Sequence, residues 1–345
     1  MMSSFASTPG LSRRRFLPGA GAFAFAGALW SCRRTTEAAE LTIYSGRGEN
    51  LIGPVLQQAE QALGLKINTR YGNSAQMALA ILEDGKNTRA DLFLAQESGA
   101  LGALVREKRF VPLPEDLLNQ VDRRYRSPQG FWVGISGRSR VIDYNTRLVK
   151  PGELPKSIYE LIQPRWKGQV GWAPANGSFQ AFVTAMRLLG GDDKTLAWVK
   201  AMKQNGARNY PSNAPIVEAL GRGEIQLGLV NNYYLHRFTA ENPNFPVAHH
   251  YTKGDPGALV LVSGAGVLDV AGDRREAALR VIGYLLSAPA QTHFAQTNNE
   301  YPLAAGVSAE PGRIPLSELD PPDIDLSRLE DLEGTLKLIE SAGVL

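Results

Sequence analysis

The chain has 345 residues, a formal net charge of +3 and one cysteine, which excludes a disulfide framework and a cysteine-rich metal cluster. With 43% hydrophobic and 21% charged residues, it has the composition of a soluble globular protein, and its length suits two domains. Four histidines leave little for a histidine-based metal site, and the charge is too weak to predict a nucleic-acid partner.

Residues 1–32 have the pattern of an export signal. They lack Asp and Glu, and a basic string at 12–17, SRRRFL, precedes a short apolar run that ends at Trp30. The string resembles a twin-arginine signal, and the LWSC string at 29–32 resembles a lipobox, which predicts lipidation at Cys32. A cleaved signal without lipid, or a simple anchoring helix, is the alternative. Without these residues the chain has 34 basic and 34 acidic side chains, so the charge excess belongs to the signal.

From residue 41 onward, short β-rich runs alternate with amphipathic helices. Strands are predicted at 41–44, 66–71 and 91–94, and helices at 51–63, 74–84 and 99–107. This alternation predicts an α/β sheet with mostly parallel strands.

A long extended segment is predicted at 132–145, and a second set of units follows it. That set has strands at 170–172 and 225–230, helices at 178–189, 194–204 and 215–220, and another extended crossing at 258–263. Helices at 274–286 and 331–341 complete the chain. Two α/β lobes joined by two extended crossings form a hinge architecture that closes around ligands.

The predicted organisation has five parts. They are a signal at 1–32, a linker at 33–40, the first part of lobe 1 at 41–138, lobe 2 at 139–262, and the return to lobe 1 with the C-terminal helices at 263–345.

Three turns between a strand and a helix have the residues of a ligand site. The first, GRGENL at 46–51, lacks the third glycine and the acidic partner of a dinucleotide site, and presents Arg47 and Glu49 beside a helix N-terminus as an anion cradle would. The other two are ANGS at 175–178 and YPSNAP at 210–215, whose small polar residues can cap helices. One such turn is usually only a cap, but several in a bilobal protein favour a ligand cleft.

The string VNNYY at 230–234 ends a strand and begins a helix. Adjacent tyrosines usually serve packing, yet a phenol, with its pKa of about 10, becomes a phenolate beside a trivalent hard cation. Two phenolates on Fe3+ leave one positive charge and open positions, which a carbonate or a carboxylate could fill.

Several strings together resemble the periplasmic ferric-ion-binding proteins of ABC transporters, over nearly the whole chain after the signal. The strings are YSGR at 44–47, ADLF at 90–93, SGRSRV at 136–141, WKG at 166–168, NNYY at 231–234, DPGALV at 255–260 and EYPL at 300–303. The resemblance implies the type II periplasmic-binding-protein fold, in which mixed sheets flanked by helices form two lobes, a two-strand hinge and a cleft between the lobes.

The resemblance also implies a set of site residues. Tyr233 and Tyr234 match the paired iron ligands of that family. The positions that hold its synergistic anion are matched by Asn176, Gly177, Ser178, Asn213 and Asn231, and the anion-binding set expected here adds Ser45, Arg47 and Arg138.

Three departures from the family affect the remaining iron ligands. Many members have a His where this chain has Gly48, some have a Tyr at the position of Glu49, and some have a Glu at the position of Gln96. Glu49 or Gln96 could complete the shell, the cargo could differ from free Fe3+, or water could fill the open positions. We favour exogenous anions held by Arg47 and Arg138, because a guanidinium matches carbonate with two hydrogen bonds, although Arg138 suits a structural salt bridge equally well.

The expected function is therefore a monomeric periplasmic binding protein that captures Fe3+ with carbonate and delivers it to an inner-membrane ABC permease. It would need no organic cofactor and would touch the membrane only through a lipid at Cys32. One alternative keeps the fold and changes the cargo to a phosphonate, thiamine or a polyamine. An enzyme is not expected, because the chain has no G-x-S-x-G, P-loop or H-E-x-x-H motif and no cysteine after the signal.

Overall fold

The computed structural model describes residues 40–307 and 313–345. The predicted signal, nearly all of the linker and the lipidation site Cys32 lie outside these residues. No helix among the described residues is both long and apolar enough to cross a bilayer.

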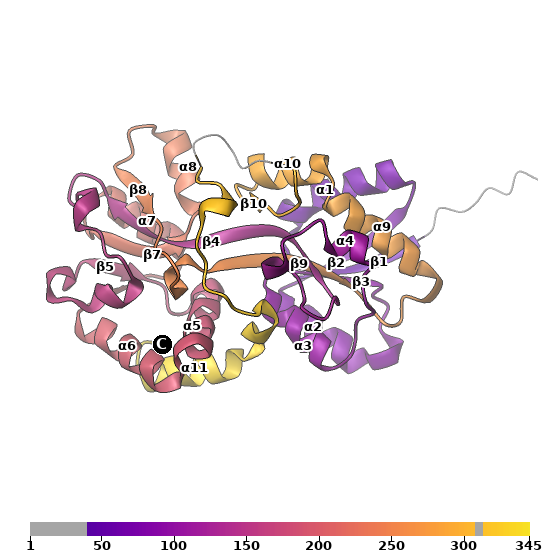
Figure 1. The fold of residues 1–345 in the computed structure, drawn as a ribbon, viewed down its shortest axis with the longest axis horizontal. Helices are drawn as coiled ribbons and strands as arrows, with labels where there is room; N and C mark the ends of the chain where they lie inside the picture. The colour runs from indigo at the N-terminus through magenta and orange to yellow at the C-terminus, as the bar shows by residue number, and fades with distance from the viewer. Residues whose placement is uncertain (1–39, 308–312) are drawn as a thin grey trace, which may run out of the picture. The chain divides into compact units, whose positions relative to one another are not determined.

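The first half of the sheet is built as predicted, with small shifts at the ends of its elements. Its strands are β1 (Glu40–Ser45), β2 (Lys66–Tyr71) and β3 (Leu92–Ala95), and its helices are α1 (Glu49–Leu63), α2 (Ser74–Asp84), α3 (Ser98–Arg106) and the short α4 (Glu115–Leu118). β1 pairs with β2 and β3 in parallel, and helices cover both faces (Figure 1). β3 is buried on both faces, which explains its continuous apolar run.

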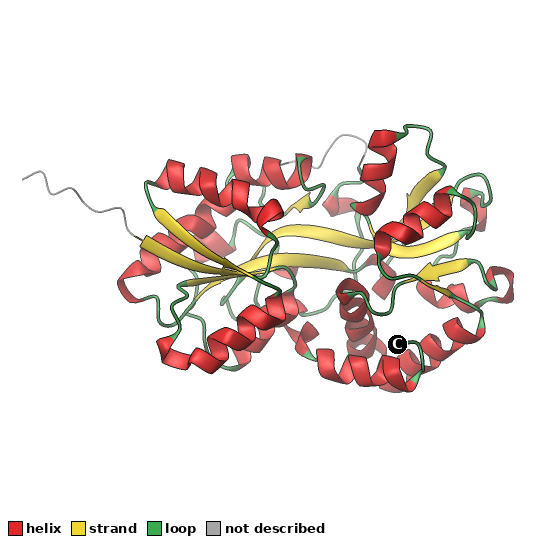
Figure 2. Cartoon of the chain, turned by 180° about the vertical axis from the view of Figure 1, so that it is seen from behind, coloured by secondary structure: helices red, strands yellow, loops and turns green. Residues whose placement is uncertain are grey.

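Two long strands cross between the halves of the sheet. They are β4 (Val133–Asn145) and β9 (Val260–Val267), and Figure 2 shows them side by side. They pair antiparallel with each other, and β9 also pairs antiparallel with β3. The sheet is therefore mixed, as the family resemblance implies, and not mostly parallel, because one crossing strand leads out and the other returns.

The second half of the sheet continues from β4. Its strands are β5 (Val170–Trp172), β6 (Arg208–Asn209), β7 (Leu227–Asn231) and β8 (Val247–His250), and its helices are α5 (Gly177–Gly190), α6 (Asp192–Gln204), α7 (Asn213–Gly221) and α8 (Tyr234–Glu241). The strand order is β2-β1-β3-β9-β4-β7-β5-β6. β4 pairs with β9 up to Ser139 and with β7 from Arg140 onward. The predicted lobe boundaries stay a prediction.

The C-terminal region adds α9 (Arg275–Leu285), α10 (Ala288–Gln296), β10 (Tyr301–Pro302), the 3-10 turn η9 (Leu326–Glu330) and α11 (Leu332–Ser341). η9 packs against α3, where the position of Gly102 allows close approach. A Cβ there would lie 1.9 Å from the carbonyl oxygen of Ser327. Further along, α11 lies on α5 and α6 (Figure 1).

An aromatic cluster fixes α5 and α6 on β5. The indole of Trp172 meets Phe179 edge to face at 5.6 Å and Trp198 at 6.3 Å between ring centroids, and Phe182 meets Trp198 at 6.0 Å. All four side chains are buried. Edge-to-face pairs add to the free energy gained by burial. The cluster therefore fixes the position of α5 and of the turn at its N-terminus.

A buried ion pair joins three segments that are far apart in the sequence. Nη2 of Arg47 lies 2.8 Å from a carboxylate oxygen of Glu300, and its Nη1 donates to Oγ of Ser136 at 2.9 Å. Arg47 and Glu300 are almost completely shielded from solvent. The pair connects the turn after β1 to β4 and to the start of β10.

We expect Glu300→Ala to lower the free energy of unfolding by about 3–5 kcal/mol, because it leaves the buried Arg47 charge without a counter-ion. Glu300→Gln keeps an acceptor for the guanidinium and should lose less. Urea denaturation of both variants measures the difference. Both variants remove the negative charge, so wild-type stability in both would contradict a role for the charge, and equal losses would contradict a role for the acceptor.

Candidate functional site

Tyr233 and Tyr234 lie together at the start of α8. β7 ends at Asn231, and the chain turns directly into the helix. The two rings stack with centroids 4.3 Å apart and planes inclined by 28°, and both side chains are partly buried. Stacking of adjacent rings directs the two phenols to the same side, which the sequence alone does not establish.

Arg140 of β4 is a buried cation beside this pair, and the sequence analysis did not single it out. Its Nη1 donates to Oδ1 of Asn231 at 3.0 Å, and its guanidinium lies 5.4 Å from the ring centroid of Phe182. Burial lowers the pKa of Arg140 to about 10, and the neighbouring Tyr234, Tyr233 and Asp143 oppose that shift. Its Nε and Nη2 have no hydrogen-bond partner within the described part of the chain.

The N-terminal turns of α5 and α7 meet each other. Oδ1 of Asn176 accepts from the backbone N–H of Ser178 at 3.1 Å and caps α5. Nδ2 of Asn213, the first residue of α7, reaches the same Oδ1 at 3.4 Å. The structure therefore brings together the predicted anion-binding residues Asn176, Gly177, Ser178 and Asn213, whereas the contact of Asn231 is with Arg140.

Several residues of the predicted site and its surroundings have unpartnered polar atoms. Besides Arg140, Oδ1 of Asn213 and Nδ2 of Asn232 are buried with no hydrogen-bond partner among the residues described. Asn232 also accepts from the backbone N–H of Ser139 at 2.9 Å, which fixes its orientation. Buried polar groups are nearly always hydrogen-bonded, so this concentration indicates a place for a polar ligand.

Arg138 makes its contacts to other segments of the protein. It donates to Oγ of Ser263 at 3.0 Å and to the backbone oxygen of Gln96 at 2.5 Å, and forms a salt bridge of 3.3 Å with Glu97. Burial raises the pKa of Tyr233 above its ordinary value, and the charge of Arg138 acts against this. Arg138 therefore forms a structural salt bridge, which the sequence analysis named as one of its two possible roles. Its charge also acts on Tyr233.

Gln96 follows β3 and lies beside Arg138. Its backbone N–H donates to Oγ of Ser74 at 2.9 Å, whereas its Oε1 is buried without a partner among the residues described. This oxygen is thus available to a ligand, although no contact with either tyrosine shows that it coordinates the same one.

The first turn is occupied by its own contacts. Oγ of Ser45 donates to the backbone oxygen of Arg47 at 3.0 Å, and both Nη atoms of Arg47 are bonded to Ser136 and Glu300. Only Nε of that guanidinium lacks a partner in the described residues. An anion-binding role for Ser45 and Arg47 stays a prediction, and the fold gives Arg47 a structural role.

Glu49 lies in a different place from the tyrosines. It is exposed at the start of α1 and lines a surface pocket of about 580 Å³ together with Glu60 and Tyr71. Burial raises the pKa of Tyr71, and the charges of Glu49 and Glu60 add to this. Tyr233, Tyr234 and Arg140 are not among the residues that line that pocket.

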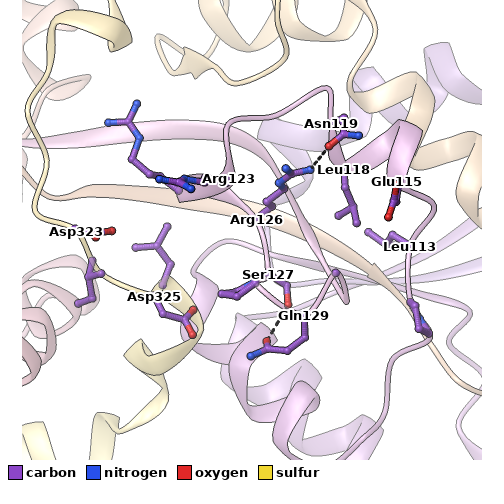
Figure 3. A pocket seen from close by; sticks show the side chains of 16 residues that line it. Leu113, Glu115, Leu118, Asn119, Arg123, Arg126, Ser127, Gln129, Asp323 and Asp325 are labelled. Atoms are coloured by element: carbon purple, nitrogen blue, oxygen red, sulfur yellow. Dashed lines mark hydrogen bonds between the residues drawn. The ribbon is translucent and has the colours of Figure 1, made fainter.

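A further pocket lacks the residues of the predicted site. A pocket of about 770 Å³ is lined by Arg123 and Arg126 and by Asp323 and Asp325 of the C-terminal segment. Its charges are of both signs, and none of the predicted site residues lines it. Figure 3 shows Arg126 pointing to Asn119, to whose Oδ1 it donates at 3.0 Å. No group of three or more His, Cys, Asp or Glu side chains in residues 40–307 and 313–345 could hold a metal ion.

Comparison with known proteins gives consistent results. Residues 87–315 match the family described as bacterial extracellular solute-binding protein. A "Fe(3+)-binding periplasmic protein" of Serratia marcescens is 33% identical over 88% of this chain and 90% of its own length. "Iron uptake protein A1" of Synechocystis is 32% identical over 96% of this chain and 98% of its own.

Comparison with solved structures indicates the same family. Iron-bound HitA from Pseudomonas aeruginosa has a TM-score of 0.79 at 31% identity, covering 88% of this chain and 99% of its own. Trichodesmium IdiA (FutA), solved with iron and citrate ligands, has a TM-score of 0.79 at 27% identity, covering 89% of this chain and all of its own. These similarities confirm the predicted α/β fold of the type II periplasmic binding proteins. The chain belongs to the bacterial extracellular solute-binding proteins, the family that includes the ferric-ion-binding proteins of the periplasm.

Proposed function

We propose that this protein captures Fe3+ through the phenolates of Tyr233 and Tyr234, together with a carbonate held beside Arg140. The supporting observation is the pair of unpartnered guanidinium nitrogens of Arg140, buried next to two stacked tyrosines. A guanidinium in this setting needs an anion, and the N-terminal turns of α5 and α7 favour one in the same place.

The charges of such a complex balance well. Fe3+ with two phenolates has one positive charge, and a carbonate dianion changes the total to one negative charge. Arg140 then neutralises the complex inside a buried site where an unbalanced charge is costly. Asn176, Gly177, Ser178, Asn213 and Asn231 would orient the carbonate through backbone and amide groups.

Few protein groups are available for the remaining coordination positions of the iron. Gln96 offers a neutral oxygen, Glu49 is placed in a separate pocket, and Arg47 and Arg138 already bond to the protein. A second exogenous anion or water therefore fits the open positions better than Glu49 does. Loading would be followed by delivery to an ABC permease in the inner membrane, as befits an extracellular solute-binding protein.

Replacement of the two tyrosines tests the iron site directly. Wild-type protein titrated with ferric citrate in bicarbonate buffer should develop a phenolate-to-iron charge-transfer band, because each phenolate donates electron density to Fe3+. The band should be lost in the double variant Tyr233→Phe, Tyr234→Phe and kept in Tyr284→Phe, which changes a tyrosine of α9. A folded wild-type protein without the band would refute the proposal.

Arg140→Met separates anion binding from folding. Loss of charge-assisted hydrogen bonds to carbonate should weaken iron binding by roughly tenfold or more and remove its dependence on bicarbonate. The free protein should be at least as stable as wild type, because Met removes the desolvation cost of a buried charge that forms no salt bridge among the described residues. Iron competition assays with and without bicarbonate measure the first effect, and urea denaturation the second. Arg222→Met, at an exposed position after α7, is the matched control. Unchanged bicarbonate dependence in Arg140→Met would contradict the role.

We also propose export by the twin-arginine route and lipid attachment at Cys32. In the full-length chain, Arg13→Lys with Arg14→Lys should retain the precursor in the cytoplasm. Cys32→Ala should transfer the exported protein from the membrane fraction to the soluble fraction, because a lipid chain adds about 0.8 kcal/mol of membrane affinity per CH2 group. Cell fractionation measures both. Normal export of the lysine variant, or membrane retention of Cys32→Ala, would contradict the corresponding part.

A further inference from the structure

Another cavity lies between the two sets of helices. Its volume is about 270 Å³, and its walls come from α2 and α3 on one side, from α5 on another, and from Leu261 and the start of the C-terminal helix region. Two lining residues adjoin the site already described: Gly177 follows Asn176, and Glu97 is paired with Arg138.

The walls of this cavity are apolar and made mainly of small side chains. Ala78, Ala100, Ala103 and Ala181 line it from three helices, with leucines beside them. Alanines leave a smooth surface that can contact both faces of a flat group. An aromatic ring would remove apolar surface from water on both sides, and this burial is favourable.

One end of the cavity has polar groups that suit a carboxylate. The first residues of α2, α3 and α5, namely Ser74, Ser98 and Gly177, all line it, and helix N-termini favour negative charge. Ser98 is fully buried, and its Oγ has no hydrogen-bond partner among the described residues. A buried hydroxyl without a partner is unusual and can donate to a ligand.

The two acidic residues of the lining do not oppose such a ligand. Glu97 is paired with Arg138, and Glu330 lies 2.9 Å from Arg106. Each carboxylate already has a cation beside it that balances its charge. The partial positive charges of the helix N-termini therefore favour an anion in the cavity.

We infer that this cavity receives the ring of an aromatic carboxylate that enters with the metal, so that the cargo includes ferric complexes of the salicylate class. The inference rests on the proposed iron site. The carboxylate group would lie at Ser98 and the helix N-termini, and the ring would lie between the alanines. When the ring hydroxyl coordinates Fe3+, its proton passes to solvent, and iron changes neither oxidation state nor protein ligands.

Equilibrium dialysis with radiolabelled iron and carbon-14 salicylate tests this. Wild-type protein should retain about one salicylate per iron, and should retain none without iron. Ala181→Leu places a larger side chain in the cavity and should weaken salicylate retention at least tenfold, while iron with bicarbonate is retained as in wild type. Ser98→Ala should weaken it about fivefold, through loss of one hydrogen bond.

Ala62→Leu, at an exposed alanine of α1 outside the cavity, is the matched control and should behave as wild type. Absence of salicylate from wild-type protein that retains iron with bicarbonate would overturn this inference and leave the iron site intact. Equal retention by wild type and Ala181→Leu, or retention without iron, would also overturn it. Failure of wild-type protein to retain iron with bicarbonate would instead refute the proposed function.

Discussion

The organisation of this protein depends on how the positive charges of three buried guanidinium groups are balanced. Arg47, Arg138 and Arg140 are each at most 1% exposed. An arginine does not lose its proton in a protein interior, so each one needs acceptors or a counter-ion. Glu300 serves Arg47 and Glu97 serves Arg138, whereas Arg140 has the amide oxygen of Asn231 and an aromatic ring. This difference separates two arginines whose charges are paired within the fold from Arg140, to which the proposed function assigns an anion.

β4 converts that difference into a binding site. Residues two apart on a strand share a face, so Ser136, Arg138 and Arg140 lie on the same side of β4. Ser136 meets Arg47, Arg138 meets the turn after β3, and Arg140 meets the end of β7. The strand changes its pairing partner between the second and third of these positions. A single strand thus connects the structural ion pairs of one half to the unpartnered cation of the other.

The tyrosine site and the apolar cavity differ in chemistry. The first has hard oxygen ligands, amide groups and a cation, and the second has alanines and a buried hydroxyl. Hard ligands suit a trivalent metal, whereas a smooth apolar wall suits the carbon skeleton of a chelator. Under the two proposals, Gly177 and Glu97 of the cavity lining connect the two sites, and metal and organic anion are recognised as one cargo.

The sequence by itself determined the order and type of most elements, because apolar periodicity and turn residues act locally. It also indicated the paired tyrosines and the asparagines of the anion turns, which follow strands or start helices. Only the tertiary structure decided the roles of the arginines, since Arg47, Arg138 and Arg140 look alike in the sequence. Their partners Glu300 and Glu97 come from distant segments, and the strand pairings that decide which guanidinium keeps free nitrogens are long-range. The same holds for Glu49, which the fold places in a pocket apart from the tyrosines.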